Sequence, residues 1–212
     1  MPDPLQRPGT FFSFVGGLHD RPALVAHSGR GCGIGVDASP LAARQLFGVP
    51  AGSLSSRVVE LDELFGVTMT AELHDRVHQA TTWPDRFRVL DDVIGRVMSS
   101  RGSCSVPPEV VEAWRCIVLS KGDTSVEALA AHVGWSRRHL TSRFGSEIGL
   151  SPKVAMRVVR FEAACELLLS NRLPRLADVA VQAGFYDQSH LTREWCDLAG
   201  LLPNNMVVGR VP

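Results

Sequence analysis

The second half of the sequence contains one motif twice, and this internal repeat constrains the fold more than any other feature. The first copy reads LAAHVGWSRRHLTSRF over residues 129–144, and the second reads VAVQAGFYDQSHLTREW over 179–195. Gly134 matches Gly184 at an offset of 50 residues, but the later matches fall at an offset of 51, so one residue is inserted in the second turn. These later matches are Leu140 with Leu191, Phe144 with Trp195, Gly149 with Gly200 and Pro152 with Pro203. The repeat predicts two copies of one supersecondary unit.

Each copy predicts a helix-turn-helix. Apolar residues recur at helical spacing, a glycine permits a tight turn, and a second apolar series follows. Thr124 and Glu127 have the spacing of a capping box ahead of the first copy. The first helices carry the apolar residues Val126, Leu129, Ala130 and Val133, and Leu176, Val179, Ala180 and Ala183. The second helices carry Leu140, Phe144 and Ile148, and Leu191, Trp195 and Leu198.

The face opposite each apolar series carries hydrogen-bonding side chains. They are Arg138, Thr141 and Ser142 in the first copy and Ser189, Thr192 and Arg193 in the second. A helix face of this composition can enter the major groove of DNA and contact base edges and phosphates. A solvated face is the competing interpretation, and the same register in two copies disfavours it.

A longer helix is predicted between the copies, from Ser151 as cap and Pro152 in the first turn to about Leu169. A basic stripe of Lys153, Arg157 and Arg160 accompanies an apolar stripe of Val154, Val158, Phe161, Cys165 and Leu168. The segment from Ser136 to Arg160 contains six basic residues and one acidic residue, and phosphate binding needs such a local excess of positive charge. Ordinary solvated charge remains the alternative for the basic stripe.

The first half predicts a different organisation. Residues 11–38 have the pattern of short strands, with a hairpin formed by 23–27 and 32–37, and helical patterning starts at Pro40. Residues 99–108 are small and polar, so we expect a linker there. The predicted fold is mostly α, with an α+β N-terminal region over 1–104 and an all-α double helix-turn-helix domain over 105–212.

The two motifs, their spacing and the helix between them resemble the AraC/XylS-type family of bacterial transcription regulators over about residues 106–206. The resemblance implies that both second helices occupy successive major-groove segments of double-stranded DNA. It also implies an N-terminal region that senses a small-molecule effector or mediates homodimerisation, with RNA polymerase as a candidate partner. The N-terminal part is short for such a sensor, so a truncated sensor, a reduced sensor and a region of another kind are the alternatives. By motif match, the implied base-reading residues are Arg137, Arg138, Thr141 and Ser142, and Gln188, Ser189, His190, Thr192 and Arg193. Lys153 and Arg157 are predicted to contact phosphate.

Composition and scattered residues favour a cytoplasmic regulator over other classes. No apolar run is long enough for a membrane span or a secretory signal, and the five cysteines are widely scattered without a C-x-x-C motif. His74 and His78 have chelating spacing, but their segment has the charge pattern of a solvated helix. We therefore expect no enzyme, no cofactor and no metal site. The alternatives are a metal-dependent enzyme or a protein-interaction module in the N-terminal region, with the DNA-binding part as an accessory.

Overall fold

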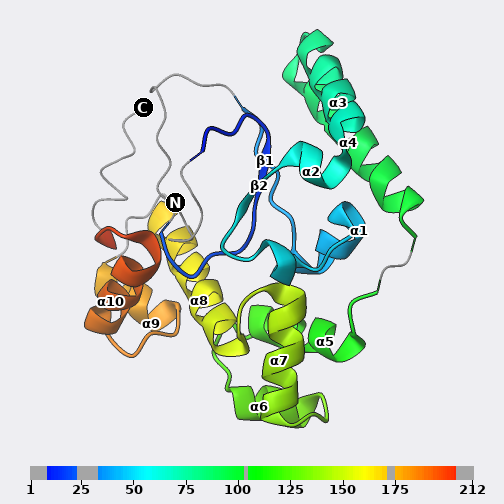
Figure 1. Ribbon diagram of the computed structural model, residues 1–212. Coiled ribbons are helices and arrows are strands. Elements are labelled where there is room, and N and C mark those ends of the chain that lie inside the picture. The colour runs from blue at the N-terminus through cyan, green and yellow to red at the C-terminus, as the bar shows by residue number, and fades with distance from the viewer. Residues whose placement is uncertain (1–8, 23–32, 103–104, 171–174, 204–212) are drawn as a thin grey trace.

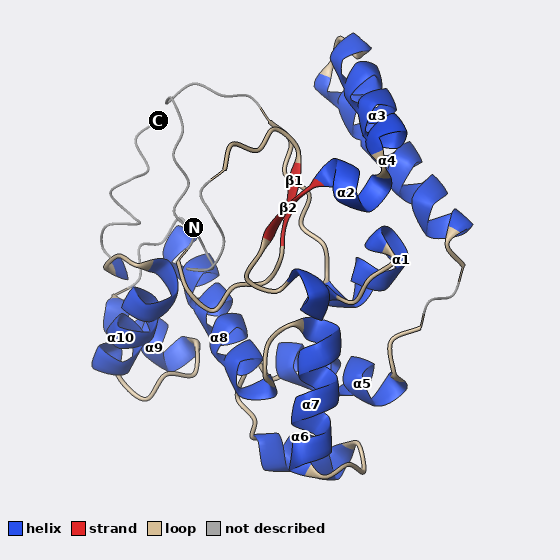
Figure 2. Cartoon of the chain, in the orientation of Figure 1, coloured by secondary structure: helices blue, strands red, loops and turns tan. Residues whose placement is uncertain are grey.

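A computed structural model describes residues 9–22, 33–102, 105–170 and 175–203 (Figure 1). Helices dominate these residues, and the sheet is small, so the prediction of a mostly α fold is confirmed (Figure 2). The helical hairpin of the N-terminal region and the last two helices lie at opposite ends of the view in Figure 1. Within the described ranges, no helix combines the length and the hydropathy that crossing a bilayer requires.

The sheet has two strands that come from distant parts of the sequence. Strand β1 (Phe14–Gly16) pairs antiparallel with β2 (Val58–Glu60), and Val15 lies opposite Val59. The predicted hairpin is wrong where it can be seen, because residues 33–37 form no strand, whereas residues 23–32 lie outside the described residues. Gly33 and Gly35 explain the failure, since glycine loses much backbone entropy in a strand and offers no side chain to pack.

Short helices and one helical hairpin make up the rest of the N-terminal region. Leu73 of α3 (Val67–Gln79) packs with Val93 and Val97 of α4 (Trp83–Ser100), and these buried residues form the core of the hairpin. Thr82 caps α4 by accepting a hydrogen bond from the Asp85 amide at 3.3 Å. The elements are η1 (Pro40–Ala42), α1 (Ala43–Phe47), η2 (Ala51–Leu54), α2 (Leu61–Phe65), α3 (Val67–Gln79) and α4 (Trp83–Ser100).

The C-terminal region contains six helices in the described ranges, and two pairs of them have matching lengths. Helices α6 and α9 have 7 residues each, and α7 and α10 have 12 residues each. The cap of α6 is Ser125, whose hydroxyl accepts from the Ala128 amide at 3.1 Å, so the capping box predicted at Thr124 is wrong by one residue. The helices are α5 (Pro108–Leu119), α6 (Val126–His132), α7 (Arg137–Ile148), α8 (Pro152–Leu169), α9 (Leu176–Gln182) and α10 (Gln188–Ala199).

The repeat extends into a supporting helix that the motifs did not reveal. Ala113 and Ile117 of α5 are fully buried beneath the first helix-turn-helix. Ala164 and Leu168 of α8 lie 51 residues further along the sequence and are buried beneath the second. Each repeat is therefore a three-helix unit with its own core. The first unit is α5, α6 and α7, and the second is α8, α9 and α10.

Helix α8 has the predicted bounds but a different buried face. The Ser151 hydroxyl caps it by accepting from the Val154 amide at 3.3 Å. Its buried residues are Pro152, Ala155, Met156, Val159, Ala164 and Leu168, whereas most of the predicted apolar stripe is half-buried. The stripe was misplaced because the N-terminal turns of α8 pack into the core of the first unit and its C-terminal turns into that of the second.

The N-terminal region packs against the C-terminal end of α7. Arg44 of α1 forms a bidentate ion pair with Glu147 of α7 at 2.7 and 2.9 Å, and the Glu147 side chain is only 4 % exposed. The Ser55 hydroxyl donates to the Gly149 carbonyl at 2.6 Å. Helix α4 ends at Ser100 and α5 begins at Pro108, which fits the predicted linker. The division of the chain into domains at residue 104 stays a prediction, because Arg44 and Ser55 on one side of it bond to Glu147 and Gly149 on the other.

Candidate nucleic-acid interface

The two helix-turn-helix turns have nearly the same backbone geometry. Gly134 has a φ of 72° and Gly184 a φ of 77°, which is the left-handed region that glycine adopts at little cost. The Trp135 amide donates to the Ala130 carbonyl at 2.9 Å, and the Phe185 amide donates to the carbonyl at the matching residue, Ala180, at 2.8 Å. The turns therefore aim α7 and α10 away from α6 and α9 in the same way.

The second helix of each unit is fixed at both ends. Ser136 caps α7 by accepting from the His139 amide at 3.2 Å, and Asp187 caps α10 by accepting from the His190 amide at 2.6 Å. Both helices end at a left-handed glycine. Their predicted apolar series are confirmed, because Leu140, Phe144, Ile148, Leu191 and Trp195 are all fully buried, whereas Leu198 is half-buried. This burial decides which faces remain outside.

The outer face of α7 carries the predicted polar residues. Arg138, Thr141 and Ser142 are all exposed. Arg137 is exposed as well, but its guanidinium lies 2.6 Å from the carboxylate of Glu127 in α6. The first unit thus brings one arginine and two hydroxyls together on one side, and it ties the other arginine to the preceding helix.

The residues predicted on the outer face of α10 fall into two groups, one exposed and one engaged in contacts within the unit. Gln188, Ser189 and Arg193 are exposed. The Thr192 hydroxyl donates to the Gln188 carbonyl of the same helix at 2.9 Å. His190 is half-buried, because its ring meets the Phe185 ring edge-on at 5.4 Å and its Nδ1 accepts from the Tyr186 amide at 3.3 Å. Thr192 and His190 are therefore engaged within the unit.

The two basic residues predicted to contact phosphate have different surroundings on α8. Lys153 is exposed in the first turn. Arg157 is half-buried, and its guanidinium lies 2.5 Å from the carboxylate of Glu194 and 3.4 Å from that of Asp197. Arg157 thus joins the supporting helix to α10, as does the edge-on contact of Phe161 with Trp195 at 4.7 Å.

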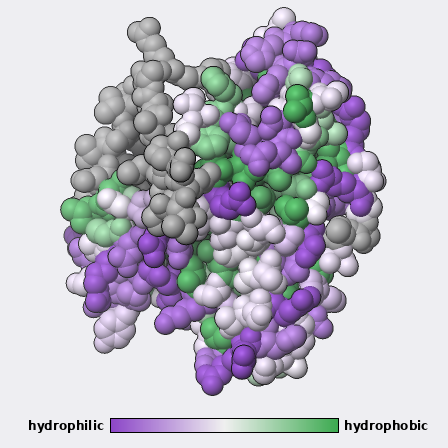
Figure 3. Space-filling view, viewed as in Figure 1, coloured by the Kyte–Doolittle hydropathy of each residue, from purple (hydrophilic) through white to green (hydrophobic). Residues whose placement is uncertain are grey.

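Helices α7 and α10, which carry the exposed polar faces and are called the outer helices below, differ in charge. Helix α7 carries three arginines and one glutamate, and the glutamate is the buried Glu147 that Arg44 neutralises. Helix α10 carries one arginine, Arg193, and two carboxylates. Hydrophilic side chains gather over the region of α9 and α10 at the lower left of the space-filling view and near α6 at its lower end (Figure 3). Of these two helices, α7 therefore carries most of the positive charge.

Two exposed residues near these helices were not among the predicted site residues. Tyr186, the residue inserted in the second turn, is 90 % exposed and lies just before α10. Arg143 is exposed on α7 and entered the prediction only as part of the local charge. The change of offset from 50 to 51 was the signal that could have singled out Tyr186.

Comparisons with known proteins match the C-terminal part of the chain. A family model described as a helix-turn-helix domain matches residues 129–207. YbfI, an uncharacterized HTH-type transcriptional regulator of Bacillus subtilis (strain 168), is 35 % identical over 69 residues, which are 32 % of this chain and 24 % of the relative. The C-terminal domain of AraT, a response regulator from Geobacillus stearothermophilus, aligns with 50 % of this chain and 89 % of its own at 28 % identity and a TM-score of 0.47.

The matched residues include both turns and both outer helices. The duplicated turn geometry, the helix that supports the second unit and the spacing of the two motifs agree with the resemblance that the sequence motifs carry. The matches to a helix-turn-helix domain model and to an HTH-type transcriptional regulator agree with the resemblance of the C-terminal part of this chain to the double helix-turn-helix domain of the AraC/XylS type.

Proposed function

We propose that this protein is a sequence-specific DNA-binding transcription regulator. The observation that carries the proposal is the duplication itself, in which two turns of matching geometry present α7 and α10 with polar outer faces. An exposed helix that follows such a turn fits the major groove. In this proposal α7 and α10 enter successive major-groove segments of one duplex.

Base reading is assigned to the exposed side chains of the two outer helices. Arg138 and Arg193 can each pair bidentately with the O6 and N7 atoms of guanine. Thr141, Ser142, Gln188 and Ser189 can donate to base edges or to phosphates. His190 and Thr192 have a positioning role, because their polar groups are engaged inside their own unit. Arg137 stays available to base edges, because both partners of its ion pair with Glu127 are exposed and such pairs are weak.

Phosphate contact is assigned to Lys153 rather than to Arg157. Lys153 is exposed, whereas Arg157 is half-buried and its guanidinium is paired with the carboxylates of Glu194 and Asp197. Moving this guanidinium to a phosphate would leave the half-buried Glu194 without its partner. The sequence-based assignment of Arg157 to phosphate is therefore replaced by a role in holding α10 to α8.

Regulation is assigned to the N-terminal region, as a response either to a small-molecule effector or to a second copy of the chain. The support is the contact of α1 and η2 with the end of α7 through Arg44 and Ser55. A change in the N-terminal region would reach the first outer helix through these bonds. RNA polymerase is the further partner that a role as transcription regulator implies.

Selection of bound sequences from a random duplex pool, followed by footprinting on the selected site, tests the proposal. Two units one helical turn apart should protect about 20 base pairs without internal symmetry, because their outer side chains differ. The affinity should fall as salt concentration rises, since phosphate contacts release counterions. Protection of about half that length would contradict reading by two units, and failure to enrich any sequence would contradict sequence-specific binding.

A further inference from the structure

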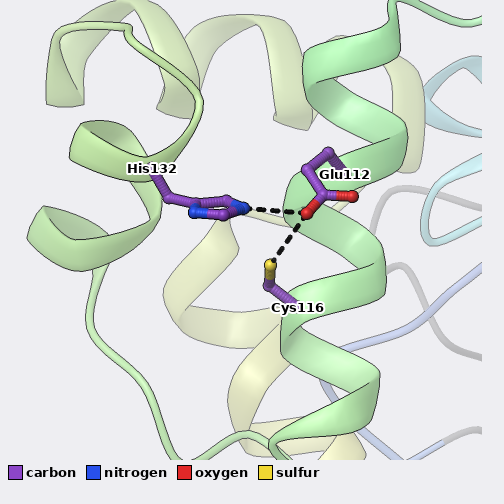
Figure 4. Close-up of side chains that lie close together, drawn as sticks. All are labelled: Glu112, Cys116 and His132. Carbon is purple, nitrogen blue, oxygen red and sulfur yellow. Dashed lines mark hydrogen bonds and ion pairs between the residues drawn. The ribbon is translucent and has the colours of Figure 1, made fainter.

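Three side chains with different metal-binding atoms meet between α5 and α6 (Figure 4). Glu112 and Cys116 lie one turn apart on the same face of α5, and His132 is the last residue of α6. The His132 Nε2 atom lies 2.8 Å from the Glu112 Oε1 atom, and the Cys116 Sγ atom lies 3.6 Å from the same oxygen. The three atoms lie within 4.8 Å of one another. None of them belongs to the exposed faces of α7 and α10.

We propose that Glu112, Cys116 and His132 bind a Zn²⁺ ion through one carboxylate oxygen, the thiolate sulfur and the imidazole nitrogen. Zinc prefers these three donor types, at about 2.0–2.3 Å in a tetrahedral arrangement, which places ligand atoms about 3.3–3.7 Å apart. The observed separations need small side-chain adjustments to reach this geometry. Both Glu112 and His132 are partly exposed, so an ion can enter and a water molecule can complete the tetrahedron.

The second unit indicates that the architecture does not require these residues. The positions that match Glu112 and Cys116 51 residues later are Ala163 and Leu167 on α8. The position that matches His132 at the end of α6 is Gln182 at the end of α9. Packing a supporting helix against the first helix of the unit is therefore achieved there without this donor set. The three donors distinguish the first unit.

Glu112 is already an ionised acceptor, and Arg115 orients it. The Arg115 guanidinium donates to both carboxylate oxygens at 2.7 Å. Zinc binding would replace the bonds that the thiol and the imidazole make to Oε1. The thiol proton is released to solvent, and the imidazole binds in its neutral form. The Arg115 charge opposes the ion, but this side chain is 56 % exposed and well screened by solvent.

We expect the ion to fix the end of α6 to α5, next to the turn that leads into α7. His132 is followed by Val133 and Gly134, so an ion would hold the last residue of α6 against α5 just before the chain turns into α7. Because the ion would bind the folded unit, its stabilisation of that unit should grow with the logarithm of the free zinc concentration once this exceeds the dissociation constant. This site does not depend on DNA binding, so either proposal can fail without the other.

A cobalt titration of the whole chain tests the site. The protein is prepared without a histidine tag, reduced and treated with a chelator, and Co²⁺ is then added as an optical substitute for Zn²⁺. The result expected is one equivalent bound with a thiolate-to-cobalt charge-transfer band, which added Zn²⁺ removes. Cys116→Ser should abolish the band, and His132→Gln should weaken Co²⁺ binding on the order of tenfold or more. His132 is half-exposed, so its replacement leaves the fold intact.

Matched variants separate this site from other binding. Cys196→Ser removes another free, half-buried cysteine, and His78→Gln breaks the pair of His74 and His78 on α3, so both variants should bind Co²⁺ as the parent does. Zn²⁺ at about a hundredfold over its dissociation constant should raise the unfolding temperature of the parent by about 5–10 °C but not that of His132→Gln. A missing charge-transfer band would overturn the proposal, as would a band that survives Cys116→Ser or depends on Cys196 or His78.

Discussion

The two three-helix units share a backbone design but have different surroundings. The first unit is contacted by the N-terminal region, through the ion pair of Arg44 with Glu147 and through the Ser55 hydroxyl. The position that matches Glu147 in the second unit is Leu198, which is half-buried and apolar. The second unit is instead joined to its own supporting helix by Arg157 and Glu194. The duplicated fold thus has an ion pair to the N-terminal region in one copy and an internal ion pair in the other.

This difference separates what the fold requires from what each unit does. The glycine turn, the alanine beneath it and the buried apolar series occur in both units, because each unit must pack the same crossing of helices. The charges vary, since three arginines lie on α7 and one lies on α10. We therefore expect α7 to supply more of the electrostatic affinity for DNA than α10, which should contribute mainly through its local contacts.

The largest expected effects come from the matched aromatic residues in the two cores. Phe144→Ala and Trp195→Ala each remove a fully buried ring and should lower the free energy of unfolding by about 3–5 kcal/mol. Hydrogen exchange should then distinguish the units. Phe144→Ala should also accelerate exchange in α1 and η2, whereas Trp195→Ala should not. Equal acceleration of α1 and η2 in both variants would show that the N-terminal region does not depend specifically on the first unit.

Removal of Arg44 tests the contact that sets the first unit apart. Arg44→Ala leaves the buried Glu147 carboxylate without this guanidinium, so the free energy of unfolding should fall by about 3 kcal/mol in denaturant titrations. Adding Glu147→Leu, the residue type found in the second unit, should restore most of the loss. A double variant that is no more stable than Arg44→Ala would indicate that the carboxylate is not the source of the loss.

The two basic residues on α8 should have smaller and unequal effects on DNA binding. Lys153→Ala should lower the slope of log affinity against log salt concentration by about 0.9, since an exposed lysine can neutralise one phosphate. Arg157→Ala should change that slope less, because its guanidinium already faces two carboxylates. The measurement is a titration of the selected duplex at several salt concentrations. Equal slope changes for both variants would place Arg157 on the DNA.

The sequence predicted the turns and most helices of the C-terminal units well, because the features that specify them are local. A glycine at the turn, the cap at Ser151 and the apolar spacing at Leu140 and Phe144 each specify geometry within a few residues. The predicted faces followed from this spacing. The environment of Arg157 could not be predicted, because its partner Glu194 lies 37 residues away and the pair forms only after two helices pack.

The N-terminal region was predicted poorly, because its structure depends on contacts between residues far apart in the sequence. Its strands pair residues such as Val15 and Val59, which no short pattern connects. The ion pair of Arg44 with Glu147 joins residues 103 positions apart, so the contact between the two halves of the chain was not foreseen.

The cluster of Glu112, Cys116 and His132 was also missed, because scattered cysteines without a C-x-x-C motif favour inert thiols.

Binding-site selection repeated with Arg138→Ala and with Arg193→Ala tests the central claim that each unit reads its own part of one site. Loss of a bidentate contact with guanine should weaken discrimination at one or two base positions by about 1–3 kcal/mol. Arg193→Ala should relax preferences in one half of the site and leave the other half intact, and Arg138→Ala should show the opposite pattern. Both variants retain the other unit's outer face, so they serve as controls for each other. A uniform loss of affinity with every base preference preserved, in either variant, would contradict the claim.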